Sequence, residues 1–135
     1  MYPILYLFSD YGILALRLAL GLILVAHGWP KIKNLRGTGA WLASVGFRPG
    51  MLWAPVIAIV EFFGGLALVA GIGVQVVTFL IAGQFAVILV WKLIGRQPFV
   101  QRAAEGYVAG YEFDLIIFAA ALALLTLGAG AWAIL

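Results

Sequence analysis

The sequence predicts an all-α membrane protein with four transmembrane helices in an up-down-up-down bundle. Three observations lead to this prediction: 66% of the 135 residues are apolar, only 10% are charged, and the apolar residues fall into four long runs. A soluble domain carries about 25% charged residues, so a chain with a mean hydropathy of +1.17 suits lipid better than water. We expect residues 1–135 to form one domain, because spans that pack together form one unit.

The four apolar runs have the length of membrane spans. About 20 apolar residues in a helix cross a bilayer core, and such runs occupy about residues 11–29, 52–70, 74–94 and 113–132. Backbone N–H and C=O groups inside lipid must bond one another, so each run is predicted to be a helix. The connections are short, which makes consecutive helices antiparallel neighbours.

Turn-forming residues separate the runs. The segment "PKIKNLRGTG" ends the first run, "AGIG" separates the second from the third, and "GRQPFVQRAAEGYVAGYE" separates the third from the fourth. In the first loop, Trp41, Leu42 and Val45 recur at helical spacing after Thr38, which is a candidate N-cap. We predict a short helix in the membrane interface here. An apolar loop packed on the mouth of the bundle is the alternative.

The positive residues predict the orientation, because cytoplasmic loops are rich in Lys and Arg. Seven of the eight positive residues lie at or in the first and third loops: Lys31, Lys33, Arg36, Arg48, Lys92, Arg96 and Arg102. We therefore expect a multi-pass protein of the inner (plasma) membrane, with both of these loops in the cytoplasm and both termini outside, in the periplasm. The same distribution accounts for the net charge of +3 without a nucleic-acid partner.

Polar residues inside the spans mark a candidate site. Arg17 lies in the first span and Glu61 near the middle of the second. A lone charge at such a depth costs at least ~2.5 kcal/mol, so we predict an ion pair between them, with Gln84 at a similar depth. This cluster is either a structural pair that fixes helix register or a site for a ligand or proton. Small residues on the same helix faces predict close helix packing: Gly21, Gly28, Gly64 and Gly65.

A second polar group collects at the cytoplasmic helix ends: His27, Trp29, Lys31, Lys92, Glu112 and Asp114. Trp and Lys at helix ends are ordinary interface anchors, and carboxylates favour helix N-termini. His27 lies about one turn inside the membrane, where it is either a hydrogen-bonded packing residue or a functional donor. The chain has no cysteine, one histidine and two methionines, so we predict neither a metal site nor a covalently bound cofactor.

Four blocks of the sequence resemble the DoxX/DoxD family of small four-helix membrane proteins. They are "LRLALGLILVAHGWPKI" (16–32), "GTGAWLASVGF" (37–47), "EFFGGLALVAGIG" (61–73) and "YEFDLIIFAAALALLTLGAG" (111–130), in the family's order. The resemblance implies a link to oxidoreductase systems, since one relative is a subunit of a thiosulfate:quinone oxidoreductase. Positions carried over by motif are Arg17, His27, Gly28, Glu61, Gly64, Gly65, Glu112 and Asp114. The Gly-Pro-Gly turn and polar tail that often end the family's last helix are replaced here by "LGAGAWAIL".

Two functional hypotheses follow. In the first, the chain is a membrane subunit of a quinone-linked oxidoreductase complex; it has no electron carrier of its own and needs a redox partner. The quinone would be bound by Arg17, His27, Trp29, Glu61 and Gln84, with Lys92, Glu112 and Asp114 at the cytoplasmic mouth. In the second, the chain is an accessory subunit that stabilises a larger membrane complex and has no chemistry of its own. A solute transporter is a weaker third hypothesis, because no pair of interrupted helices is evident.

Overall fold

The computed structural model describes residues 8–44, 46, 48–96, 100–103 and 106–134. Within these residues the chain forms five helices and one short hairpin: α2 (Ser9–Lys33), α3 (Leu35–Ser44), α4 (Gly50–Ala70), α5 (Val74–Ile94), β1 (Val100–Ala103), β2 (Gly106–Ala109) and α6 (Tyr111–Leu127). Helices α2, α4 and α5 are each long and apolar enough to cross a membrane. The chain is therefore a multi-pass helical membrane protein by composition and length.

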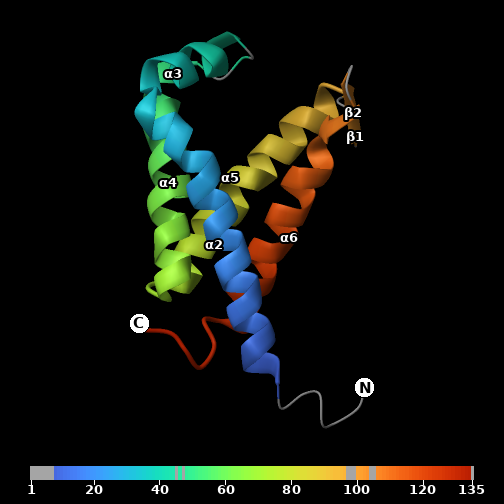
Figure 1. Ribbon diagram of the computed structural model, residues 1–135. Coiled ribbons are helices and arrows are strands. Elements are labelled where there is room, and N and C mark those ends of the chain that lie inside the picture. The colour runs from blue at the N-terminus through green and yellow to red at the C-terminus, as the bar shows by residue number, and fades with distance from the viewer. Residues whose placement is uncertain (1–7, 45, 47, 97–99, 104–105, 135) are drawn as a thin grey trace.

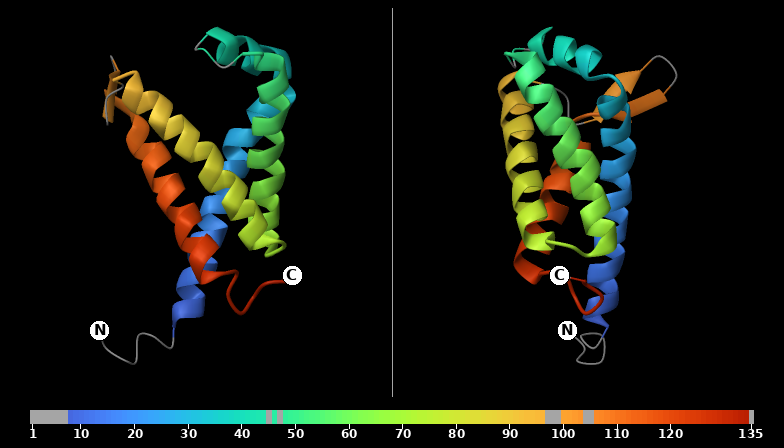
Figure 2. Two further views of the ribbon diagram at one scale, coloured as in Figure 1. Left: turned by 180° about the vertical axis from the view of Figure 1, so that it is seen from behind. Right: turned by 90° about the vertical axis from the view of Figure 1, so that its left-hand side faces the viewer.

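The four long helices are arranged as two pairs that diverge. Helix α2 lies along α4, and α5 lies along α6 (Figure 1). The pairs meet at the end that carries both termini and separate towards α3 and the hairpin, as the second set of views also shows (Figure 2). The helices alternate in direction along the chain, as the short loops predict, but they form a V and not an evenly packed bundle.

The predicted spans agree most closely with the helices at the turn between α4 and α5. Gly71 and Gly73, with φ of 80° and 56°, make the turn between α4 and α5, since glycine adopts positive φ without a steric cost. Helix α6 ends at Leu127, five residues before the predicted end at 132. Gly128 and Gly130 also have positive φ, 85° and 80°, and break the helix there. With 17 residues, α6 is shorter than α2, α4 and α5, the helices that are long and apolar enough to cross a membrane.

The loops differ in detail from the prediction. Helix α3 begins at Leu35, so Thr38 is not its N-cap. Instead the Asn34 side-chain oxygen accepts a hydrogen bond from the Gly37 backbone N–H, 3.0 Å away, as an N-cap does. Val45 lies outside the described residues.

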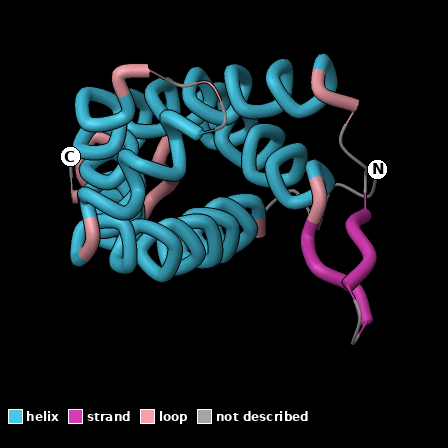
Figure 3. The backbone as a smooth tube through the Cα atoms, turned by 90° about the horizontal axis from the view of Figure 1, so that it is seen from above, coloured by secondary structure: helices cyan, strands magenta, loops and turns pink. Residues whose placement is uncertain are grey.

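Two further features complete this end of the molecule. Helix α3 packs on α4 through a close approach of Gly39 and Gly50. An antiparallel hairpin, which the sequence does not predict, pairs Val100 with Ala109 and Ala103 with Gly106. Seen from above, the hairpin projects away from the helices (Figure 3).

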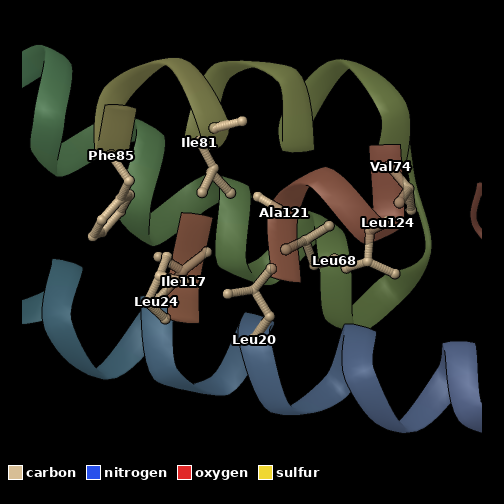
Figure 4. Packing of buried hydrophobic residues seen from close by; sticks show 10 residues of the cluster. Leu20, Leu24, Leu68, Val74, Ile81, Phe85, Ile117, Ala121 and Leu124 are labelled. Atoms are coloured by element: carbon tan, nitrogen blue, oxygen red, sulfur yellow. The ribbon is translucent and has the colours of Figure 1, made fainter. Parts of the chain in front are cut away.

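The hydrophobic core lies where the two helix pairs meet. Its buried members come from all four long helices: Leu20, Leu24, Leu68, Val74, Ile81, Ala82, Phe85, Ile117, Ala121 and Leu124 (Figure 4). Within the α2–α4 pair, a Cβ atom on Gly65 would lie 2.6 Å from the Gly21 carbonyl oxygen, and one on Gly28 would lie 2.6 Å from the Phe62 nitrogen. These glycines let the two backbones touch, as at tightly packed membrane interfaces. Gly64 faces α5 instead, near Val77 and Ile81.

Candidate functional site

A pocket of about 530 Å³ occupies the space between the diverging helix pairs. Its walls are mainly apolar and come from α2, α3, α4, α5 and α6. The polar side chains that line it are few: His27, Lys31, Thr38, Glu61, Gln84, Lys92 and Asp114. A pocket of this size, apolar with a few convergent polar groups, is typical of a small-molecule site.

Glu61 is the most buried charged group of the pocket, with 1% of its surface exposed. Its carboxylate oxygens are held from two different helices. Lys31 of α2 donates to Oε2 at 2.6 Å, and Gln84 of α5 donates to Oε1 at 2.9 Å. Hydrogen bonds to an ionised partner are about twice as strong as neutral ones. The Glu61–Gln84 bond therefore ties the α2–α4 pair to the α5–α6 pair at the base of the pocket.

A second ion pair lies on the opposite wall. Lys92, near the end of α5, donates to the Oδ2 atom of Asp114 in the first turn of α6. Asp114 is 5% exposed. Each helix pair thus contributes one lysine from the end of its first helix and one buried carboxylate from its second helix. The two ion pairs contain equal numbers of positive and negative charges, so together they leave the pocket electrically balanced.

His27 is an exposed residue of α2 on the side that faces α6. Its ring is 4.8 Å from that of Phe113, centroid to centroid, and both residues line the pocket. The contact joins the two helix pairs on this side, in addition to the bridge made by Glu61 and Gln84. His27 therefore presents a polar ring to the cavity, with an aromatic ring beside it.

Three residues of the predicted site lie elsewhere. Trp29 points away from the pocket, with 50% of its surface exposed, its ring 5.5 Å from Phe62 and the Lys33 ammonium 5.5 Å above it. This arrangement suits an interface anchor. Glu112 is half-buried at the start of α6 and does not line the pocket. Arg17 lies near the opposite end of the molecule.

The structure does not bring Arg17 and Glu61 together, so the predicted ion pair is corrected to Lys31–Glu61. The Arg17 guanidinium, buried to 2% exposure, donates to the carbonyls of Ala129 (2.8 Å) and Trp132 (3.2 Å) in the C-terminal segment. It lies level with Gly71. Gly71 is ten residues from Glu61, or about 15 Å along a helix at 1.5 Å per residue, which is beyond the reach of an arginine side chain.

Lys31 was the partner that the sequence prediction of the pair overlooked. The sequence prediction ends the first span at residue 29, before the segment "PKIKNLRGTG", whereas α2 continues through Pro30 to Lys33. Lys31 therefore remains on the helical face of Leu24 and Gly28, one turn beyond His27. That spacing was the available signal. The Lys92–Asp114 pair was likewise grouped at the cytoplasmic mouth without being predicted as a pair.

Comparison with known proteins identifies the family. The DoxX sequence profile matches residues 12–92, which is more than half of the chain and includes Lys31, Glu61, Gln84 and Lys92. The chain belongs to the DoxX family. The profile match ends before Asp114, so the second ion pair is only half within the matched region.

The chain is similar in sequence to two curated proteins. It is 33% identical over 63 residues to "Inner membrane protein YqjF" of Escherichia coli (strain K12), a match that covers 47% of each chain, so only about half of that relative is spanned. It is 30% identical over 102 residues to "Putative oxidoreductase CatD" of Bacillus subtilis (strain 168), covering 73% of this chain and 72% of the relative. No solved structure matches the chain significantly.

Proposed function

We propose that this DoxX protein is the membrane subunit of a redox-linked complex and that its pocket binds the head of a quinone. The observation that carries the proposal is the buried Glu61 carboxylate, held by Lys31 and Gln84 at the base of a mainly apolar cavity. Intramembrane ionisable groups of this kind favour a functional role. The name of the Bacillus relative, "Putative oxidoreductase CatD", agrees with the proposal.

The chemistry of the pocket suits a quinone head. Quinone carbonyl oxygens accept hydrogen bonds, and a lysine ammonium has three N–H donors, of which the Lys31–Glu61 bond uses one. The His27 and Phe113 rings offer an aromatic contact beside it. Glu61 and His27 are the groups through which protons would pass when the quinone is reduced or its quinol is oxidised. The electrons come from a partner, since the chain has no cysteine to hold an iron–sulfur cluster.

The proposal includes an orientation in the membrane. Helix α6 is the fourth span, the α3 end faces the cytoplasm, and both termini lie outside. The support is the positive charge at one end of the molecule, where Lys33, Arg36 and Arg96 lie near the ends of α2, α3 and α5. Helix α3, with Trp41 exposed and Leu42 buried, has the two-sided character of an interfacial helix.

The decisive experiment measures quinone retained by the purified protein. We expect wild type in lipid nanodiscs to retain about one equivalent of a long-tailed ubiquinone, and Gln84→Leu to weaken binding about tenfold, or ~1.4 kcal/mol, because it removes the bridge to Glu61. Gln75→Leu is the matched control, since Gln75 lies on the same helix, bonds to the Leu125 carbonyl and does not line the pocket. A wild type that binds no quinone would reject the proposal.

The accessory-subunit hypothesis has its own supporting observation. Both ion pairs, Lys31–Glu61 and Lys92–Asp114, join different helices, so either can serve to fix helix packing without a ligand. This hypothesis predicts that the protein is recovered only within a larger complex. It also predicts that Gln84→Leu leaves the function of that complex unchanged.

A further inference from the structure

We infer that the pocket opens sideways into the bilayer through the gap between α4 and α5, and that its ligand is an uncharged head carrying a long apolar chain. We call this gap the lateral portal and define it by Trp53 and Val56 of α4 with Leu80, Gly83 and Val87 of α5. A ligand of this class and route rests on the proposed function of the pocket as a quinone site.

The pocket walls are unequal. On the α2–α6 side, the His27 and Phe113 rings are in contact at 4.8 Å. At the base, Leu24 and Phe85 are buried and Gln84 bonds to Glu61. These contacts join the two helix pairs on the α2–α6 side and at the base.

The α4–α5 side is open. Four apolar pocket residues along it are between 43% and 56% exposed: Trp53, Val56, Leu80 and Val87. Gly83 also lines the pocket, and a Cβ atom added to it would meet nothing within 4 Å. Both helices are long and apolar enough to span a membrane, so the gap between them faces hydrocarbon. Lipid chains therefore have direct access to the cavity.

The charges of the pocket select the kind of head. Lys31 is paired with Glu61, and Lys92 is paired with Asp114. A charged head would add an uncompensated charge to a balanced site of low dielectric, which is costly. An uncharged head with hydrogen-bonding oxygens adds none and can still accept from the lysine N–H groups. The apolar walls of the portal then hold the chain attached to that head.

Gly83 gives a sharp test of the route. Gly83→Phe places a ring in the portal without a packing clash, because the site is open. Gly12→Phe is the matched control, since Gly12 is also helical and also unobstructed but lies on α2 near the termini. The probes are a long-tailed ubiquinone and the corresponding tail-free benzoquinone, with binding followed by quenching of tryptophan fluorescence in nanodiscs.

We expect Gly83→Phe to weaken binding of the long-tailed quinone about tenfold while changing binding of the tail-free quinone less than about threefold. Gly12→Phe should change neither. Equal effects on both quinones, or no effect on either, would overturn the lateral portal while leaving the quinone site intact.

A second measurement separates the portal from the quinone. The chain has no cysteine, so Gly83→Cys carries a single bimane label, with Ser44→Cys as the control on exposed α3. Phospholipids with brominated acyl chains should quench the label at residue 83 and not at residue 44. If wild type binds neither quinone, the proposed function fails. In that case, quenching of the label at residue 83 assigns the portal to another uncharged lipid with an apolar tail. A label at residue 83 that is not quenched overturns the portal.

Discussion

The two ends of this molecule hold their cations in different ways. At the terminal end, Arg17 has no carboxylate partner among the described residues and is held by the carbonyls of Ala129 and Trp132. At the open end, Lys31 and Lys92 are each paired with a buried carboxylate that faces the pocket. A cation bonded to the chain's own backbone fastens a segment, whereas a cation paired at a cavity wall retains donors for a ligand. The comparison teaches that burial of charge alone does not mark a site.

Breaking the Lys31–Glu61 ion pair should have the largest effect on the free energy of unfolding. Glu61→Leu leaves Lys31 without its carboxylate, and breaking one partner of a buried pair costs about 3–5 kcal/mol. Because the Lys31 side chain is 31% exposed, we expect the lower end, about 3 kcal/mol. Glu61→Leu combined with Lys31→Leu should recover part of that loss, since no charge is left unpaired. Unfolding in detergent, followed by circular dichroism against denaturant, gives the free energies.

The control for this cycle is the pair that the structure separates. Glu61→Leu with Arg17→Leu should give losses that add within about 0.5 kcal/mol, as residues that do not touch usually do. A large coupling between Arg17 and Glu61, with none between Lys31 and Glu61, would contradict the geometry and restore the sequence prediction.

Releasing the C-terminal segment should have the second largest effect. Arg17→Leu removes two hydrogen bonds from a charged donor, each worth about 1.5–3 kcal/mol, but it also removes the cost of burying that charge, so we expect a net loss of about 2 kcal/mol. Cleavage by a protease within residues 128–134 should accelerate, while quinone binding should stay within about twofold of wild type. Arg17→Lys should restore only part of the stability, because lysine lacks the planar fork that reaches two carbonyls. Equal loss of quinone binding would show that the ends are not independent.

The fold was largely predictable from sequence because hydropathy and glycine act locally. The four apolar runs and the break at Gly71 and Gly73 follow from solvent and backbone sterics, whereas the prediction placed the end of the last helix at residue 132, five residues beyond Leu127. The divergence of the two helix pairs did not follow, since it depends on where side chains of different helices meet. The hairpin between α5 and α6 was also missed, because its strands are only four residues each and carry little pattern.

The site was half predictable. His27, Glu61 and Gln84 were selected as polar residues in apolar runs, and the structure places all three at the pocket. The ion-pair partners of the charged residues were not predictable, because a charge in a span predicts that a partner exists without saying which residue it is. Depth decides it, and depth depends on whether α2 stops at Pro30. Because α2 continues for one further turn, Lys31 and not Arg17 is the partner of Glu61.

The second ion pair should have a smaller effect on stability than the first. Asp114→Asn keeps a hydrogen-bond acceptor for Lys92 but removes the negative charge, so we expect a loss of about 1 kcal/mol. It also leaves the pocket with one excess positive charge. Affinity for an anionic single-chain lipid, such as a fatty acid, should therefore rise several-fold, measured by tryptophan quenching. Glu112→Gln is the control outside the pocket, and a gain of the same size there would argue against charge balance as the selecting feature.

The smallest expected effect concerns the helix that covers the open end. Asn34 caps α3 through the Gly37 N–H, and Asn34→Ala should cost about 1 kcal/mol, as loss of an N-cap does. The loss should be confined to the first turn of α3, where amide hydrogen exchange should speed up, because α3 packs on α4 through Gly39 and Gly50 farther along.

Thr38 and Trp41 of α3 line the pocket, so quinone binding should weaken by less than about threefold. Asn34→Ser retains a capping oxygen and should behave as wild type. If Asn34→Ala instead abolished binding, α3 would be an essential wall of the pocket, and the ion pairs of the open end would not be sufficient to hold a ligand.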